Sequence, residues 1–253
     1  MSKTGLKDFL DKKVDEYNQP FFIKDDPICI PHLFTRKQDI EIAGFFAAIF
    51  AWGNRTTIIN KSNELLRLMK MPPYDFCVSH DQKGLKTLTG FKHRTFNDTD
   101  LLYFVEFFNH HYSQHNSLES AFTMHGDTIE KMLTGFHHYF LSLDHVPGRT
   151  RKHIANPERG STCKRLNMFL LWMVRHDDKG VDFGIWKKIT PAQLICPIDL
   201  HVARVAKRFN LLRRKQIDWL AAVELTDYLR TLDKDDPVKY DFALFGMGVM
   251  DKF

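Results

Sequence analysis

Two residues in the C-terminal half of the chain, Lys164 and Asp199, are of types that could carry out covalent chemistry. Lys164 starts an apolar-periodic segment, and its neighbours at i+4 and i+7 are Met168 and Leu171. A lysine on a partly apolar face can lose hydration, which favours its neutral form. A neutral amine is the nucleophile that forms a Schiff base. The alternative interpretation is a surface lysine that binds a phosphate group.

Asp199 precedes a second apolar-periodic segment, residues 197–209, which reads PIDLHVARVAKRF. The ordinary role of an aspartate at this position is to cap the helix that follows. A capping aspartate held at a cleft could also act as a general base or stabilise a developing cation. His201 is expected to orient the backbone or to satisfy a hydrogen bond near the site, rather than to take part in the chemistry.

The segment before Lys164 is basic, and a glycine, two hydroxyl residues and a cysteine come directly before the lysine. Backbone N–H groups at a helix N-terminus carry partial positive charge and suit a phosphate. The two hydroxyls could contribute further contacts, or they could serve only as ordinary helix caps. The expected nucleic-acid contacts of this region are Arg149, Arg151, Lys152, Arg159, Gly160, Ser161, Thr162 and Arg165.

Charge is divided unevenly along the chain. Residues 149–253 hold 20 Lys and Arg against 13 Asp and Glu, whereas residues 1–148 hold 16 against 18. Positive charge concentrated in one part of a chain favours a polyanionic partner. The other interpretation is a solvated basic surface without a partner.

Several classes of protein are disfavoured by composition. The four cysteines form no CxxC pair and no Cys/His cluster, so we expect neither a metal nor a cofactor. The cysteine count fits a reduced, cytoplasmic protein. No apolar run is long enough to cross a membrane, and the N-terminal residues lack a signal-peptide core, so we expect no membrane partner.

Helical spacing of apolar residues dominates the sequence, and strand-like alternation is scarce. The pattern therefore predicts an all-α fold. We expect helices over residues 6–17, 39–52, 57–69, 101–112, 118–124, 127–143, 163–175, 186–189, 199–209 and 216–232, with a last helix capped at 236–237 and ending at Gly246 or Gly248.

A basic G-x-x-x-K turn that runs into a helix, followed by Pro-x-Asp-x-His-x-x-Arg-Val, resembles the helix-hairpin-helix DNA glycosylase superfamily. In that superfamily a lysine at the head of the helix after the hairpin attacks the sugar C1′, and an aspartate at the head of a later helix assists. Lys164 and Asp199 match these two positions. Residues 47–66, AAIFAWGNRTTIINKSNELL, are similar to the superfamily's loop that enters the duplex, where Asn54 or Arg55 would act as the wedge.

The chain also departs from that superfamily. The hairpin reads Asn-Pro-Glu-Arg-Gly-Ser instead of Leu-Pro-Gly-x-Gly, and the iron–sulfur cysteines of one branch are absent. The separation between Lys164 and Asp199 is long, as it is in the archaeal 8-oxoguanine glycosylases. Phrases such as CKRLNMFLLWMVR and DPVKYDFALFGMGV are typical of a bacterial family whose function is unknown.

The resemblance implies two helical lobes, one of residues 39–145 and one of residues 1–38 with 146–253, with Lys164 and Asp199 facing a cleft between them. It also implies a bifunctional DNA glycosylase and AP lyase that removes an oxidised base, such as 8-oxoguanine, after flipping it from double-stranded DNA. Trp52, Phe169 and Trp172 are candidates for stacking on that base, and the alternative for each of them is an ordinary core position. We expect a monomer.

Two other functions fit the same residues. One is a non-catalytic nucleic-acid-binding protein that keeps the fold without the chemistry. The other is an enzyme acting on RNA or on nucleotides, because a basic surface does not distinguish one polyanion from another.

Overall fold

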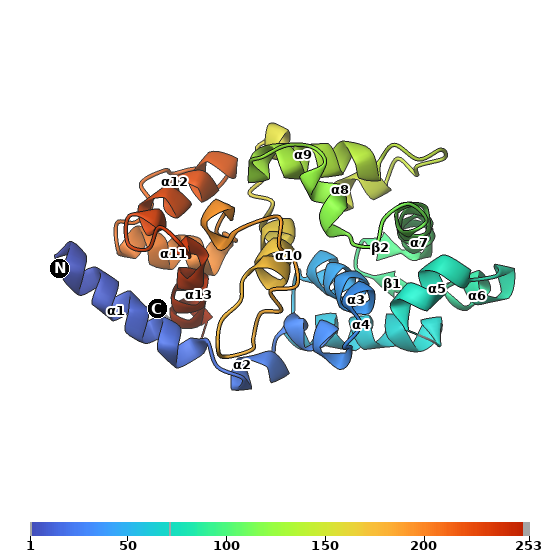
Figure 1. The fold of residues 1–253 in the computed structure, drawn as a ribbon, viewed down its shortest axis with the longest axis horizontal. Coiled ribbons are helices and arrows are strands. Elements are labelled where there is room, and N and C mark those ends of the chain that lie inside the picture. The colour runs from blue at the N-terminus through green and yellow to red at the C-terminus, as the bar shows by residue number, and fades with distance from the viewer. Residues whose placement is uncertain (1, 71, 250–253) are drawn as a thin grey trace. The chain divides into compact units, whose positions relative to one another are not determined.

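The protein is described by a computed structural model that covers residues 2–70 and 72–249. The chain forms two compact units, one of residues 1–24 and 156–253 and the other of residues 25–155 (Figure 1). The sequence placed the boundaries at residues 38 and 145. Residues 25–38 belong with the central unit because their 3₁₀ turns, η1 (Pro27–Cys29) and η2 (Pro31–Leu33), pack against the central helix α3.

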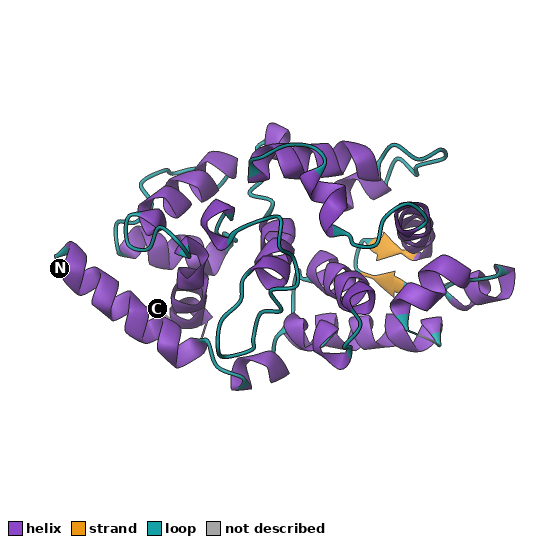
Figure 2. Ribbon diagram, viewed as in Figure 1, coloured by secondary structure: helices purple, strands orange, loops and turns teal. Residues whose placement is uncertain are grey.

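The unit of residues 25–155 is helical and also holds a short antiparallel strand pair (Figure 2). Apart from η1 and η2, its elements are α3 (Lys37–Phe50), α4 (Arg55–Met69), α5 (Pro73–Ser79), α6 (Gln82–Thr87), β1 (Lys92–His93), β2 (Phe96–Asn97), α7 (Asp98–Tyr112), α8 (Glu119–Thr123), α9 (Ile129–Phe140) and η3 (Thr150–His153).

Helix α3 lies in the core of this unit. Twelve of its fourteen residues are buried, which explains why its sequence is apolar on nearly every side. Phenylalanine rings from α3, α7 and α9 pack on one another, with Phe45 meeting Phe104 at 6.0 Å and Phe136 at 5.7 Å between ring centroids. Edge-to-face and tilted ring contacts of this kind add to the burial of apolar area.

The unit of residues 1–24 and 156–253 is built from both ends of the chain. Its elements are α1 (Lys3–Tyr17), α2 (Phe21–Lys24), η4 (Pro157–Arg159), α10 (Lys164–Val174), η5 (Pro191–Gln193), α11 (Leu200–Arg208), α12 (Trp219–Arg230), η6 (Pro237–Lys239) and α13 (Tyr240–Val249).

Helix α13 is the centre of this unit and contacts both α1 and α11 (Figure 1). The approach of α1 is close: a Cβ added to Gly246 would lie 2.3 Å from Cδ2 of Tyr17. Only glycine leaves room for the Tyr17 ring at this position. Leu6, Leu10 and Val14 bury the rest of the α1 face.

The all-α prediction is confirmed, and the long predicted helices are present with ends shifted by a few residues. The short helix predicted at 186–189 is wrong. The backbone N–H groups of Phe183 and Trp186 instead donate to the carbonyl oxygens of Trp172 and Met173, at 2.8 and 2.9 Å. This loop therefore satisfies the last carbonyls of α10 and forms no helix of its own.

The sequence did not predict α2, α5, α6 or the strand pair. Each strand has two residues, with His93 opposite Phe96 and a turn at Arg94 and Thr95. Elements this short are shaped by the surfaces on which they pack, and they span too few residues to show a period.

Candidate functional site

Lys164 is the first residue of α10, and the residue before it has an unusual backbone conformation. Cys163 adopts the left-handed region at φ 51°, which is costly for a residue with a side chain. The N–H of Cys163 donates to Oγ of Ser161 at 3.1 Å, and Nδ2 of Asn167 donates to the carbonyl oxygen of Thr162 at 3.0 Å. Local hydrogen bonds therefore fix the start of α10.

The helix N-terminus at Lys164 has no side-chain cap. The N-cap residue is Cys163, whose side chain makes no capping hydrogen bond, so neither Ser161 nor Thr162 serves as the ordinary cap. Burial raises the pKa of the Cys163 thiol to about 12, so the thiol stays protonated and does not compete with an amine as a nucleophile. The N-terminus of α10, which is the positive end of the helix dipole, therefore has no capping side chain.

The amine of Lys164 makes no hydrogen bond or ion pair with any other described residue. Its side chain is half-buried. On the face of α10 that continues from Lys164, Asn167 and Leu171 are buried and Met168 is half-buried, so this face leads toward the core of the unit. A lysine that no carboxylate neutralises keeps its amine available to a ligand.

Asp199 is the N-cap of α11, as its position in the sequence predicted. Its Oδ1 accepts hydrogen bonds from the N–H groups of His201 at 2.8 Å and Val202 at 3.0 Å. Its Oδ2 accepts no hydrogen bond from another described residue. One oxygen therefore holds the carboxylate in place while the other is available.

The ring of His201 is exposed and lies at the end of α13. Its Nδ1 is 3.2 Å from the carbonyl oxygen of Gly248, and Nη2 of Arg204 donates to that oxygen at 2.9 Å. His201 therefore satisfies a helix C-terminus, consistent with the backbone role that the sequence predicted for it.

Lys164 and Asp199 belong to the same unit, at the heads of α10 and α11. No hydrogen bond or ion pair joins the two side chains. Their convergence on one substrate stays a prediction.

The basic loop before Lys164 exposes Arg159 and Gly160. Gly160 adopts a left-handed conformation at φ 72°, and its carbonyl oxygen accepts the N–H of Trp219, the first residue of α12, at 3.2 Å. Arg165 differs from its neighbours, because burial lowers the pKa of its guanidinium to about 10. The Arg165 side chain is half-buried, so less of its guanidinium is open to a phosphate than at the exposed Arg159.

The remaining predicted contacts belong to the unit of residues 25–155. Asn54 caps α4 through its side-chain oxygen, which accepts the N–H of Thr57 at 3.2 Å, and Arg55 is the first residue of that helix. Arg151 and Lys152 are exposed in η3. The N-terminus of α4 positions the first pair of residues, and the short 3₁₀ helix η3 at the surface positions the second.

Arg149 meets the turn between β1 and β2. Its Nη2 donates to the carbonyl oxygen of Thr95 at 2.8 Å, while 41% of its side chain stays exposed. A Cβ added to Gly53 would lie 2.3 Å from Nη1 of Arg94, so the loop before α4 reaches the same turn. The fold thus brings residues 52–55 and Arg149 together, with Arg94 as an exposed cation that the sequence did not single out.

Asp100 binds several of the residues around Arg149, and the sequence did not single it out. It is fully buried, and it accepts the hydroxyl of Thr150 at 2.8 Å and the N–H of Asn97 at 3.0 Å. Its Oδ2 lies 3.3 Å from Nε of Arg149 and 3.2 Å from Nε2 of His153. The sequence signal was the capping box that Asn97 and Asp100 form at the start of α7.

Two of the three aromatic side chains proposed for base stacking do not fit that role. Phe169 and Trp172 are buried, and the ring of Phe169 packs edge-on against Trp186 at 5.4 Å. These side chains form the core of their unit. Trp52 is half-buried and packs between His93 at 4.8 Å and His153 at 6.2 Å.

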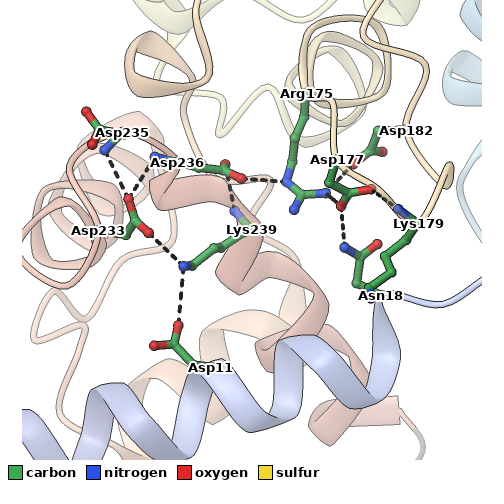
Figure 3. A network of polar contacts seen from close by, with 10 residues as sticks. All are labelled: Asp11, Asn18, Arg175, Asp177, Lys179, Asp182, Asp233, Asp235, Asp236 and Lys239. Atoms are coloured by element: carbon green, nitrogen blue, oxygen red, sulfur yellow. Dashed lines mark hydrogen bonds and ion pairs between the residues drawn. The ribbon is translucent and has the colours of Figure 1, made fainter.

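The unit of residues 1–24 and 156–253 holds a polar network with Arg175 at its centre (Figure 3). The Arg175 guanidinium donates to Asp177 at 2.7 Å, to Asp182 at 2.9 Å and to Asp236 at 2.8 Å. Burial opposes the charge of Arg175, but the attraction of the carboxylates outweighs it and raises its pKa. The sequence did not indicate this network, because Asp177 and Asp182 lie in a loop without a periodic pattern and Asp236 is 61 residues from Arg175.

The network continues to the N-terminal helix. Nζ of Lys239 contacts Asp233 at 2.6 Å and Asp11 of α1 at 3.3 Å (Figure 3). It therefore joins α1 to the C-terminal helices of the same unit and has a structural role.

Within the described residues, no group of three or more His, Cys, Asp or Glu side chains is arranged to hold a metal ion. The helices described are each too short or too polar to span a lipid bilayer.

Comparison with known protein families assigns the chain to a family. Residues 26–250 match the family described as protein of unknown function DUF2400, and the chain belongs to that family. No curated protein and no solved structure matches it significantly. The interpretation as a member of the helix-hairpin-helix glycosylase superfamily is therefore corrected, because the matching family is one of unknown function and no glycosylase family matches.

Proposed function

We propose that this member of the DUF2400 family binds DNA and excises a damaged base, with Lys164 as an amine nucleophile and Asp199 as an assisting carboxylate. The observation that carries the proposal is the position of the Lys164 amine and its lack of a neutralising partner among the described residues. It lies at the head of α10, directly after a basic loop, and no described residue neutralises it. The proposal rests on the chemistry of these residues alone.

The reaction follows from an amine that attacks a sugar carbon. Neutral Nζ of Lys164 attacks C1′ of a nucleotide that has left the base stack, and the glycosidic C–N bond breaks. The base leaves with the bonding electron pair and takes up a proton. Opening of the sugar ring converts the C1′–Nζ adduct into a Schiff base. Loss of a proton from C2′ then expels the 3′ phosphate, and hydrolysis of the imine restores the lysine.

Asp199 suits the assisting role because only one of its oxygens is engaged by the α11 backbone. The free oxygen could stabilise positive charge as it develops on the sugar, or accept the proton that Nζ loses on attack. Both roles need the carboxylate to stay ionised and oriented.

Affinity for DNA would come from phosphate contacts. The uncapped N-terminus of α10 and the exposed Arg159 could hold a phosphate next to Lys164. Arg149, Arg151 and Lys152 offer further positive charge in the other unit. Such contacts position a duplex without reading its sequence.

Borohydride trapping tests the proposal, because borohydride reduces the Schiff base to a stable amine that joins protein to DNA. The substrates are duplexes that contain 8-oxoguanine or an abasic site. We expect a covalent adduct with the wild type and its loss, by at least about 10²-fold, in Lys164→Gln. The matched control is Lys234→Gln, which removes an exposed lysine elsewhere and should leave adduct formation unchanged.

The proposal is wrong if the wild type forms no adduct with either duplex, or if Lys164→Gln traps as well as the wild type. Asp199→Asn should slow adduct formation while duplex binding stays close to that of the wild type. A loss of binding in that variant would instead indicate that Asp199 acts through the fold of α11.

A non-catalytic nucleic-acid-binding protein is the second candidate. It is favoured by the exposed cations, because Arg151, Lys152 and Arg159 could bind a polyanion whether or not Lys164 reacts. It predicts salt-sensitive binding that survives Lys164→Gln and Asp199→Asn, with no base released from any duplex. Competition between single-stranded RNA and damaged duplex DNA would identify the preferred polyanion.

A further inference from the structure

Asn167 has a buried side chain of which only one end is engaged. It is 1% exposed. Its Nδ2 donates to the carbonyl oxygen of Thr162, whereas its Oδ1 has no hydrogen-bond donor among the described residues. A buried acceptor without a donor is unfavourable, and such groups in native proteins call for an explanation.

The position of Asn167 on α10 relates it to Lys164. Residues three apart on a helix lie on the same face, with Cβ atoms about 5–6 Å apart. Side chains on a helix also tilt toward its N-terminus. The carboxamide of Asn167 therefore points toward the first turn of α10, where Lys164 begins, and its bond to Thr162 fits this direction.

Lys164 carries the hydrogen-bond donor that Oδ1 of Asn167 lacks. Its amine carries N–H donors that no described residue uses, and its chain is long and flexible. The unpaired donor and the unpaired acceptor belong to the same face of the same helix turn.

The surrounding backbone adds to this arrangement. Cys163 is held in the left-handed conformation between the Ser161 turn and the first turn of α10. Strained backbone persists where neighbouring contacts over-determine it, and it is found preferentially at functional sites. The bond from Asn167 to Thr162 is one of the contacts that hold it.

We propose that Asn167 is the positioning residue for Lys164: its Nδ2 fixes the loop before the lysine, and its Oδ1 accepts a hydrogen bond from Nζ when the amine is in its reactive position. The inference rests on the proposed function for its chemical purpose. The contact itself can be tested whether or not the protein acts on DNA.

The experiment measures the protonation of Lys164 directly. Protein labelled with ¹⁵N and ¹³C lysine is titrated by NMR, and the Lys164 signal is assigned by its absence in Lys164→Arg. Asn167→Asp places a carboxylate where the Oδ1 acceptor stands, so the titration midpoint of Lys164 should move upward by about one pH unit or more. The control, Asn116→Asp, adds the same charge at an exposed position of the other unit and should cause no shift.

A second variant keeps the test decisive if Asn167→Asp does not fold. Asn167→Leu keeps the branched shape of the side chain but has no acceptor, so the Lys164 midpoint should fall relative to the wild type. In the trapping assay the same variant should slow adduct formation by about 10–10² fold with little change in duplex affinity, because the amine is present but poorly placed.

The two proposals fail in different ways. Equal Lys164 midpoints in the wild type, Asn167→Asp and Asn167→Leu would overturn the role of Asn167, even if the wild type traps DNA. A midpoint shift together with no adduct in the wild type would support the contact and refute the excision chemistry.

Discussion

At the scale of single residues, the stability of the unit of residues 1–24 and 156–253 depends on one buried cation. Arg175 faces the carboxylates of Asp177, Asp182 and Asp236. Burial raises the pKa of Asp182 to about 7 against the attraction of Arg175, and burial likewise raises that of Asp236. Removing the cation would leave buried carboxylates uncompensated, which costs far more than the loss of an exposed ion pair.

We therefore expect Arg175→Met to lower the free energy of unfolding by about 3–5 kcal/mol at pH 7.5. The loss should be smaller near pH 5, because Asp182 and Asp236 can then be neutralised by protonation in the folded state. Urea denaturation at the two pH values measures both effects. Arg213→Met, at an exposed position, is the control, and equal losses for the two variants would contradict the prediction.

At the scale of elements, the last turn of α7 holds a histidine, His111, for which the effect of burial outweighs that of the helix dipole. A cation near a helix C-terminus is favoured by about 0.3–1 kcal/mol. His111 is nevertheless fully buried, and burial lowers its pKa to about 4, with a further small contribution from His115 and His110. Its ring nitrogens contact the hydroxyl of Tyr139 at 3.1 Å and the carbonyl oxygen of Ser117 at 3.0 Å.

The unfolded chain binds a proton at His111 below about pH 6.5, whereas the folded chain does so only near pH 4. The stability that this group contributes is therefore present above pH 6.5 and is lost as the pH falls toward 4, by on the order of 3 kcal/mol. In His111→Gln this part of the pH dependence should disappear. Denaturation between pH 4.5 and 7.5 tests the prediction, with exposed His145→Gln as the variant that should keep the wild-type slope.

At the scale of the whole molecule, one unit is assembled from chain ends that are more than 130 residues apart in sequence. Helix α1 buries Leu6, Leu10, Val14 and Tyr17 in that unit. Burying four such side chains is worth about 6–12 kcal/mol, which is comparable with the total stability of a domain, about 5–15 kcal/mol. The C-terminal segment should therefore not fold stably without α1.

Deletion of residues 1–20 should abolish slow hydrogen exchange in α10–α13, while α3, α7 and α9 keep theirs. Exchange followed by mass spectrometry resolves the two units separately. Lys12→Ala changes α1 at an exposed position and should leave both units protected. Slow exchange of α13 in the truncated protein would show that the C-terminal helices are independent of α1.

Sequence alone determined the helical class, the long helices, and the placement of Lys164 and Asp199 at helix heads, because helical period and capping residues are local properties of the chain. Only the tertiary structure decided that Phe169 and Trp172 are core residues and that Arg149 reaches the turn that holds Arg94. The tertiary structure also determined which residues form the polar networks around Arg175 and Asp100, and that Oδ1 of Asn167 is buried without a hydrogen-bond donor among the described residues. Each of these depends on which distant segments meet, and burial and charge pairing at such meetings leave no periodic trace in the sequence.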